Sequence, residues 1–277
     1  MSTPSRFEPG VMIWADRDDL STVTDLGLNY AQLGIPGGMQ LNQTASAQWK
    51  EAIAEAQVEI VTVFAAYDGE DYADIPTVQR TVGFIPPATR ASREARTLAV
   101  SDFAASLGVK SIACHIGFVP EDAAHPDYLA VRAMVRRVCD HAATHGQTFA
   151  LETGQEPAEV LLRFIADVDR PNLRINFDPA NLILYGTGEP LAALQQLFPL
   201  VVSVHCKDGD WPPAGVSGAL GTERTLGEGS VGIPRFVEAL RGLGFPGPLN
   251  VEREAENPAE RLLDLARGVE LLRTLIG

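Results

Sequence analysis

Short runs of apolar and β-branched residues alternate along the chain with longer segments in which apolar residues recur every three or four positions. The first pattern is typical of buried strands, and the second of amphipathic helices. The short runs predict eight strands, at Val11–Trp14, Tyr30–Leu33, Ile60–Phe64, Val109–Cys114, Thr148–Glu152, Leu173–Asp178, Val201–His205 and Pro248–Glu252.

The predicted helices follow these strands in regular order. They are expected at Leu20–Leu26, Ala45–Ala56, Ser92–Leu107, Pro126–His145, Pro157–Val168, Pro190–Phe198, Ile233–Leu243 and Pro258–Leu275. Proline opens several of them, as at Pro157, Pro190 and Pro258. Its missing N–H costs nothing there, because the first turn of a helix leaves its N–H groups unpaired.

Eight strand–helix units in about 250 residues are the number and the length typical of a closed barrel with an all-parallel sheet. A doubly wound open sheet is the alternative, but no G-x-G-x-x-G segment opens the first helix, and no linker divides the chain. We therefore expect residues 1–277 to form a single α/β domain, a (βα)8 TIM barrel. Its two long connections, 66–91 and 206–232, should lie at the catalytic face.

Titratable side chains stand at the carboxyl ends of the later strands. His115 follows the fourth strand, and the next four strands end in turn at Glu152, Asp178, His205 and Glu252. In a barrel these ends converge on one mouth, so the side chains should gather at the same level. The alternative is that each residue separately caps a loop or the N-terminus of a helix.

Three carboxylates crowded together repel one another, and their pKa values would be strongly raised unless a cation neutralised them. A divalent metal ion held by Glu152, Asp178, His205 and Glu252 resolves this conflict. One nitrogen and three oxygen donors suit Mn²⁺, Co²⁺ or Mg²⁺, with open positions for substrate and water. Zn²⁺ is a further candidate, although no thiolate contributes to the set.

The charge balance narrows the class of partner. With 36 acidic and 22 basic residues the net charge is −14, so nucleic acid and anionic membranes would be repelled. No apolar run is long enough to span a bilayer, and the N-terminus lacks the pattern of a secretion signal. We expect a cytoplasmic protein with no nucleic-acid or membrane partner, whose thiols are reduced at Cys114, Cys139 and Cys206.

Five segments of the second half carry a resemblance: FALETG (149–154), INFDPANL (175–182), VHCKD (204–208), LGEGSVGIPRFVEAL (226–240) and GFPGPLNVERE (244–254). They resemble the xylose-isomerase-like TIM-barrel family of sugar and sugar-phosphate isomerases and epimerases. The strand–helix order agrees over the whole chain. The order Glu, Asp, His, Glu on strands five to eight is similar to the metal site of the ketose 3-epimerases in this family.

The resemblance implies a chemistry as well as a fold. The metal ligands of the family fall on Glu152, Asp178, His205 and Glu252. A divalent metal there would take two adjacent oxygens of a ketose and stabilise an ene-diolate as a Lewis acid. Glu152 and Glu252 would be the catalytic acid and base on opposite faces of the sugar. The expected function is metal-dependent isomerisation or epimerisation of a sugar.

Five further residues are expected to contact a small carbohydrate substrate: His115, Asn181, Lys207, Asp208 and Arg224. Arg224 lies where epimerases of the family place an arginine on a substrate hydroxyl. Asn181 departs from the pattern, because those epimerases commonly carry a histidine there, and this weakens the case for a free ketose. Lys207 and Asp208 could instead orient His205 or form a salt bridge in a loop.

Other functions stay open at this point. A lyase similar to inosose dehydratases would form the same enolate from a keto-sugar or keto-polyol and then expel a β-hydroxyl. A barrel that binds sugar without catalysis is another. The family's DNA-repair branch is disfavoured, because it uses many histidines and this chain has five, of which His125, His141 and His145 are expected at the surface.

Two properties of the substrate and the assembly complete the expectations. No cluster of arginine and lysine is present to bind a phosphate, so an unphosphorylated substrate is expected. The residues do not decide whether copies of the chain form a homo-oligomer.

Overall fold

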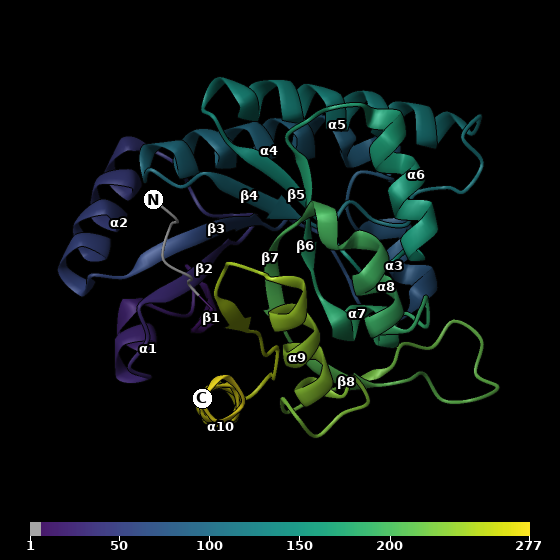
Figure 1. The fold of residues 1–277 in the computed structure, drawn as a ribbon. Helices are drawn as coiled ribbons and strands as arrows, with labels where there is room; N and C mark the ends of the chain where they lie inside the picture. The colour runs from purple at the N-terminus through teal and green to yellow at the C-terminus, as the bar shows by residue number, and fades with distance from the viewer. Residues whose placement is uncertain (1–6) are drawn as a thin grey trace.

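The computed structural model describes residues 7–277 and has a closed barrel of parallel strands at its centre (Figure 1). The barrel strands are β1 (Pro9–Trp14), β2 (Tyr30–Ile35), β3 (Glu59–Ala65), β4 (Ser111–Cys114), β5 (Thr148–Glu152), β6 (Leu173–Phe177), β7 (Val201–Cys206) and β10 (Leu249–Val251). Strand β10 pairs with both β7 and β1, which closes the ring. The (βα)8 barrel predicted from the strand–helix alternation is therefore confirmed.

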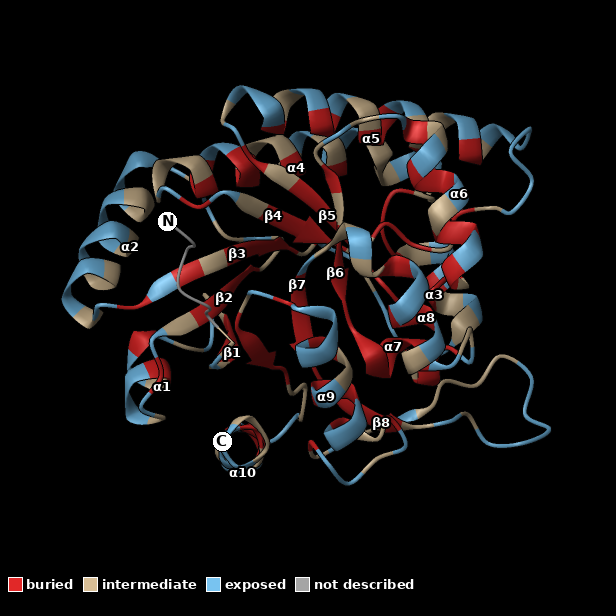
Figure 2. Ribbon diagram, in the orientation of Figure 1, coloured by how far each residue is buried: buried red, intermediate tan, exposed pale blue. Residues whose placement is uncertain are grey.

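Helices surround the barrel. They are α1 (Leu20–Asp25), α2 (Gln43–Ala56), α4 (Pro87–Ser106), α5 (Pro126–Thr144), α6 (Ala158–Val168), α8 (Pro190–Leu197), α9 (Ile233–Leu243) and α10 (Pro258–Ile276). On most of them buried residues face the strands and exposed residues face solvent (Figure 2). Within residues 7–277, no helix is both long and apolar enough to cross a membrane.

Several elements were not predicted, and each is short. Helix α3 (Ile75–Thr81) lies in the connection after β3, and α7 (Pro179–Leu184) follows β6 directly. Asp74 and Asp178 cap them by accepting hydrogen bonds from backbone N–H groups of their first turns. Strands β8 (Asp208–Asp210) and β9 (Thr222–Arg224) form an antiparallel pair in the connection after β7. Elements this short do not show a repeated apolar period.

The alternation of side chains along the strands divides the core into two parts. Outward-facing residues, Cys114 and Cys206 among them, pack beneath the helices in one large apolar cluster. The inward-facing residues include a small apolar cluster of Met12, Phe64, Ala113 and Ala150. Buried polar side chains share the barrel interior with it, at Gln32, Thr62, Asn176, Ser203 and Asn250. A polar interior of this kind needs hydrogen-bond partners, and these lead to the candidate site.

Candidate metal centre

The four residues expected at the strand ends do lie together. Ligand atoms of Glu152, Asp178, His205 and Glu252 (the barrel cluster) all lie within 4.8 Å of one another, and all four residues are buried. Glu152 ends β5 and Asp178 follows β6, while His205 lies near the end of β7 and Glu252 follows β10. The barrel topology alone brings these residues into contact across up to 100 positions of sequence, from 152 to 252.

His205 presents its Nδ1 atom to the three carboxylates. Nδ1 lies 2.6 Å from Oε1 of Glu152, 3.0 Å from Oε2 of Glu252 and 3.9 Å from Oδ2 of Asp178. On the other side of the ring, Nε2 lies 2.9 Å from Oε1 of Gln32. The nitrogen of that amide donates to Oδ1 of Asn176 at 3.2 Å, so its oxygen must accept from Nε2. Gln32 thus holds a proton on Nε2, so a metal ion would bind at Nδ1 in place of the second proton of the ring.

Two carboxylate oxygens of the barrel cluster make no well-aligned hydrogen bond. Oδ1 of Asp178 accepts from the N–H groups of Ala180 and Asn181, but Oδ2 is buried and accepts nothing. Oε2 of Glu252 is also buried and makes no well-aligned hydrogen bond, but it lies 3.0 Å from Nδ1 of His205 and 3.4 Å from Nζ of Lys207. Buried polar atoms are nearly always paired, so the unpaired Oδ2 of Asp178, beside Nδ1 of His205 and two further carboxylates, fits a divalent cation. The donor set of one nitrogen and three carboxylates fits Mn²⁺, Co²⁺ or Mg²⁺.

The electrostatics of the barrel cluster show the same demand for positive charge. Burial raises the pKa of Asp178 to about 8, and the carboxylates of Glu252 and Glu152 add to the effect. Burial lowers the pKa of His205, but Glu252 and Glu152 outweigh burial and raise it well above its usual value. A proton on this imidazole and a divalent cation therefore meet the same need, since both neutralise the carboxylates around Nδ1.

His115 joins the site from the end of β4. Its Nε2 lies 2.6 Å from Oε2 of Glu152, and Gln155 contacts its Nδ1 at 3.1 Å. Burial raises the pKa of Glu152, but His115 and His205 outweigh burial and hold that pKa at about 2. Glu152 is consequently ionised at neutral pH, with an imidazole on each of its oxygens.

A cavity of about 430 Å³ opens over the barrel cluster. Trp14 and Phe64 supply apolar walls from the strands, and Asn181, Leu184 and Tyr185 contribute another wall from α7. The two long connections complete it with Glu70, Tyr72, Leu220, Gly221 and Glu223. The volume and the mixture of aromatic and polar walls are those of a site for a small molecule.

Lys207 and Asn181 both line this cavity, as a role in substrate binding requires. The ammonium nitrogen of Lys207 lies 3.4 Å from Oε2 of Glu252. Burial lowers the pKa of Lys207, but the carboxylates of Glu252 and Glu223 outweigh burial and raise it. Lys207 is therefore a charged residue whose nearest carboxylate belongs to the barrel cluster.

Asp208 and Arg224 do not line the cavity. Asp208 is 1% exposed, and its two oxygens accept hydrogen bonds from the N–H groups of Gly209, Gly227, Gly229 and Val231. Its carboxylate is thus fully used in holding the loop after β9. The guanidinium of Arg224 lies 2.7 Å from Asp210, in a half-exposed ion pair on the β8–β9 hairpin. The structure places both residues where they contact protein groups, apart from the cavity.

The residues that orient the site were missed by the sequence reasoning. Gln32 sets the proton position of His205, and Asn176 contacts both Glu152 and His205. Oγ of Ser203 donates to the side-chain oxygen Oδ1 of Asn176 at 2.5 Å. The sequence does contain a signal for them, since Gln32 and Asn176 each stand between two apolar residues of a predicted strand. A buried amide side chain needs a hydrogen-bond partner, so each could have been expected to contact another polar group.

The chain matches the model of one protein family, the xylose isomerase-like TIM barrels, over residues 20–275. A xylose isomerase domain protein from Planctomyces limnophilus shares 42% of its residues, with a TM-score of 0.93 over 98% of this chain and 97% of that one. No curated protein matches the sequence.

Two more distant solved structures share the fold. A D-allulose 3-epimerase from Methylomonas sp., solved with D-allulose, is 18% identical, with a TM-score of 0.70 over 99% of both chains. The probable 3-DHS dehydratase AsbF from Bacillus anthracis is 17% identical, with a TM-score of 0.68 over 95% of this chain and 98% of that one.

Proposed function

Because the chain belongs to the xylose isomerase-like TIM barrel family, we propose that it is a divalent-metal-dependent isomerase or epimerase of a small polyhydroxy ketone. The observation that carries the proposal is the convergence of one imidazole and three buried carboxylates, one of them with an unpaired oxygen, beneath a small cavity. A barrel that only bound sugar would gain nothing from crowding three carboxylates together in its interior, because their burial and mutual repulsion cost stability.

The four side chains of the barrel cluster would hold the ion. A divalent ion bound there would act as a Lewis acid towards a carbonyl group of the substrate. Glu152 and Glu252 line the cavity from β5 and β10, two strands that β6 and β7 separate in the barrel. They can therefore reach a bound ketose from two sides.

Proton transfer falls to these two glutamates. One carboxylate removes the proton from the carbon next to the carbonyl, and delivery of a proton from the other side inverts that carbon. Glu152 is ionised at neutral pH, as a group that accepts a proton must be, and His115 at 2.6 Å can exchange that proton with it. Return of the proton to the neighbouring carbon would give isomerisation instead of epimerisation.

The charges around the cavity favour an uncharged substrate. Its lining includes five carboxylates, those of Glu70, Glu152, Glu223, Glu252 and Glu254. The cavity's lysine, Lys207, already pairs with Glu252, and Arg224 lies outside. A phosphorylated or carboxylated sugar would be repelled by these carboxylates, and among residues 7–277 the side chains that line the cavity offer it no unpaired lysine or arginine. Hydroxyl groups, in contrast, can donate hydrogen bonds to carboxylates.

Exchange of carbon-bound hydrogen tests the proposal. The protein loaded with Mn²⁺, Co²⁺ or Mg²⁺ is incubated with a panel of unphosphorylated ketoses in D₂O, and the products are followed by NMR. We expect solvent deuterium at the carbon next to the carbonyl, and a fall in rate of about 10²–10⁴-fold in Glu152→Gln and in Glu252→Gln. Glu238→Gln, exposed on α9, is the matched control and should keep full activity.

Elemental analysis accompanies the exchange experiment, so that a failure to bind metal is separated from a failure to turn over. Loss of water with a new enone absorption would make the protein a lyase and overturn the proposal. Metal-loaded protein that exchanges no hydrogen with any ketose would also overturn it.

A further inference from the structure

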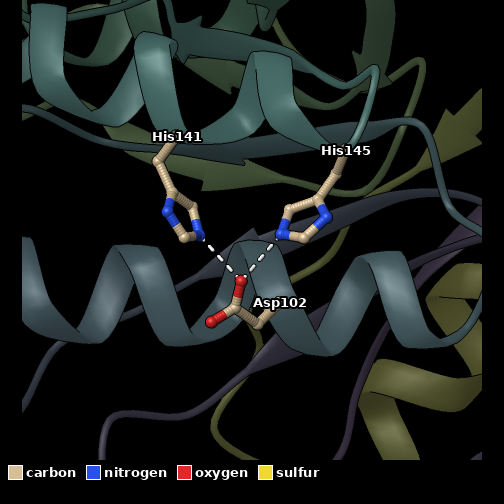
Figure 3. Close-up of side chains that lie close together, drawn as sticks. All are labelled: Asp102, His141 and His145. Carbon is tan, nitrogen blue, oxygen red and sulfur yellow. Dashed lines mark hydrogen bonds and ion pairs between the residues drawn. The ribbon is translucent and has the colours of Figure 1, made fainter.

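A second group of metal-ligating side chains lies outside the barrel. His141 and His145 are four residues apart at the end of α5, so their side chains lie on the same face of the helix one turn apart. Asp102 faces them from the neighbouring helix α4. Both rings point towards its carboxylate (Figure 3). These three residues form the helix cluster.

The distances in the helix cluster are those of converging ligands. Nε2 of His141 lies 2.7 Å from Oδ1 of Asp102, and Nε2 of His145 lies 2.8 Å from the same oxygen. All three ligand atoms fall within 4.8 Å of one another. Oδ1 of Asp102 can accept from both rings when each carries its proton on Nε2, and a cation between the three groups would instead use the two Nε2 lone pairs and the carboxylate as ligands.

The surroundings of the helix cluster also favour a cation. The carboxyl end of α5 carries the negative end of the helix dipole, and it lies beside the negative charge of Asp102. Lys110, which donates to the carbonyl oxygen of His145 at 3.0 Å, offsets part of this negative charge from the solvent side of the helix end. The imidazoles are about one-third exposed, with side-chain values of 29% and 32%, so an ion can reach them from solvent.

We propose that Asp102, His141 and His145 bind a transition-metal dication that prefers imidazole, such as Zn²⁺ or Cu²⁺. Two nitrogens and one carboxylate oxygen leave a fourth position for water, which suits tetrahedral Zn²⁺. The bound ion joins α4 to α5 on the outer surface, away from the cavity. The helix cluster differs in kind from the barrel cluster, which has one nitrogen and three carboxylates.

Metal titration of the intact protein tests the inference. We expect wild-type protein to bind two equivalents of Zn²⁺ by calorimetry, and His141→Gln and Asp102→Asn each to lose one of them. Asp178→Asn should lose the other equivalent and keep the one on the helices. The substituted helix residues are partly exposed, so circular dichroism should show an unchanged fold.

The nitrogen count distinguishes the two sites directly. Electron paramagnetic resonance of Cu²⁺ bound to the Asp178→Asn protein should show coupling to two nitrogens, which His145→Gln reduces to one. An Asp178→Asn protein that binds no Zn²⁺, whatever the wild-type protein binds, would overturn the inference. Retention of both equivalents in His141→Gln would do the same, and would leave the three residues as a hydrogen-bonded group only.

Discussion

The guanidinium of Arg261 holds the carboxylate of Asp18 in a buried, two-point ion pair. Nη1 lies 2.7 Å from Oδ1, and Nη2 lies 2.8 Å from Oδ2. Oδ2 also accepts from the N–H of Trp14, and Nε of Arg261 donates to the carbonyl oxygen of Arg253. The pair joins α10 to the connection after β1, and so fastens the seam between β1 and β10 where the barrel closes.

Removal of one partner of this pair should destabilise the protein strongly. Arg261→Met leaves the buried carboxylate of Asp18 without its cation, and we expect a loss of about 3–5 kcal/mol in the free energy of unfolding. Urea denaturation measures it, with Arg267→Met, mostly exposed on the same helix, as the control. A loss no larger than that of the control would show that water or another cation replaces Arg261.

Stability should also depend on pH through Glu156. Burial raises the pKa of this carboxyl from its ordinary value of 4.5 to about 7. A hydrogen bond from the N–H of Val119 lowers the pKa, but by less than burial raises it. The folded protein therefore binds the proton more tightly than the unfolded chain, and stability falls as the pH rises from about 4.5 to about 7. Below that range the contribution is complete.

Glu156→Gln should remove this dependence, because a neutral amide can accept the same hydrogen bond without being ionised. Relative to wild type, the variant should gain about 2–3 kcal/mol in stability between pH 5 and pH 8. Unfolding curves at both pH values give the difference, and Glu159→Gln, exposed at the start of α6, should leave the profile unchanged. An equal gain at both pH values would contradict the raised pKa.

Asp208 should control the order of the loop that carries Gly227, Gly229 and Val231. In Asp208→Asn, the amide nitrogen cannot accept from the N–H groups that the carboxylate now pairs, so backbone donors are left unpaired. We expect faster hydrogen exchange at residues 227–231. Mass spectrometry follows it, with Glu228→Gln, exposed in the same loop, as the control. Unchanged protection in the variant would mean that other contacts hold the loop.

Arg224 and Lys207 should differ in their effect on turnover. Arg224→Ala removes only a half-exposed pair with Asp210 outside the cavity, so kcat/KM of the metal-loaded protein should change little. Lys207→Met removes the cation beside Glu252 inside the cavity and should lower kcat/KM at least tenfold. Steady-state kinetics with the ketose found by hydrogen exchange measure both values. A larger fall in kcat/KM for Arg224→Ala than for Lys207→Met would contradict this assignment.

The sequence was sufficient to predict the barrel and to predict that the four residues of the barrel cluster lie together. Strand ends are set by the change from apolar to charged residues, and parallel strands in a closed ring must bring those ends together. Glu152, Asp178, His205 and Glu252 could be named on this basis. Their hydrogen bonds could not, because the roles of Gln32 and Asn176 depend on which inward-facing side chains meet across the barrel.

Loop residues were harder to assign for a physical reason. Asp208 and Arg224 stand close to the cluster in sequence, but a loop can turn a side chain towards either substrate or backbone. The outcome depends on local hydrogen bonds, such as the four that Asp208 accepts in a loop rich in glycine. At Gly229 an added Cβ would lie 2.4 Å from Oδ1 of Asp208, so this close approach requires glycine.

The connection after β7 extends away from the barrel in Figure 1, and its return segment supplies Leu220, Gly221 and Glu223 to the cavity. The barrel cluster, in contrast, is built on strands whose positions the whole ring determines. The sequence of this one segment can therefore change, and with it the shape of the cavity, while the proposed metal ligands stay in place. Exchange of residues 211–221 between relatives would be a direct way to redirect the protein towards new compounds.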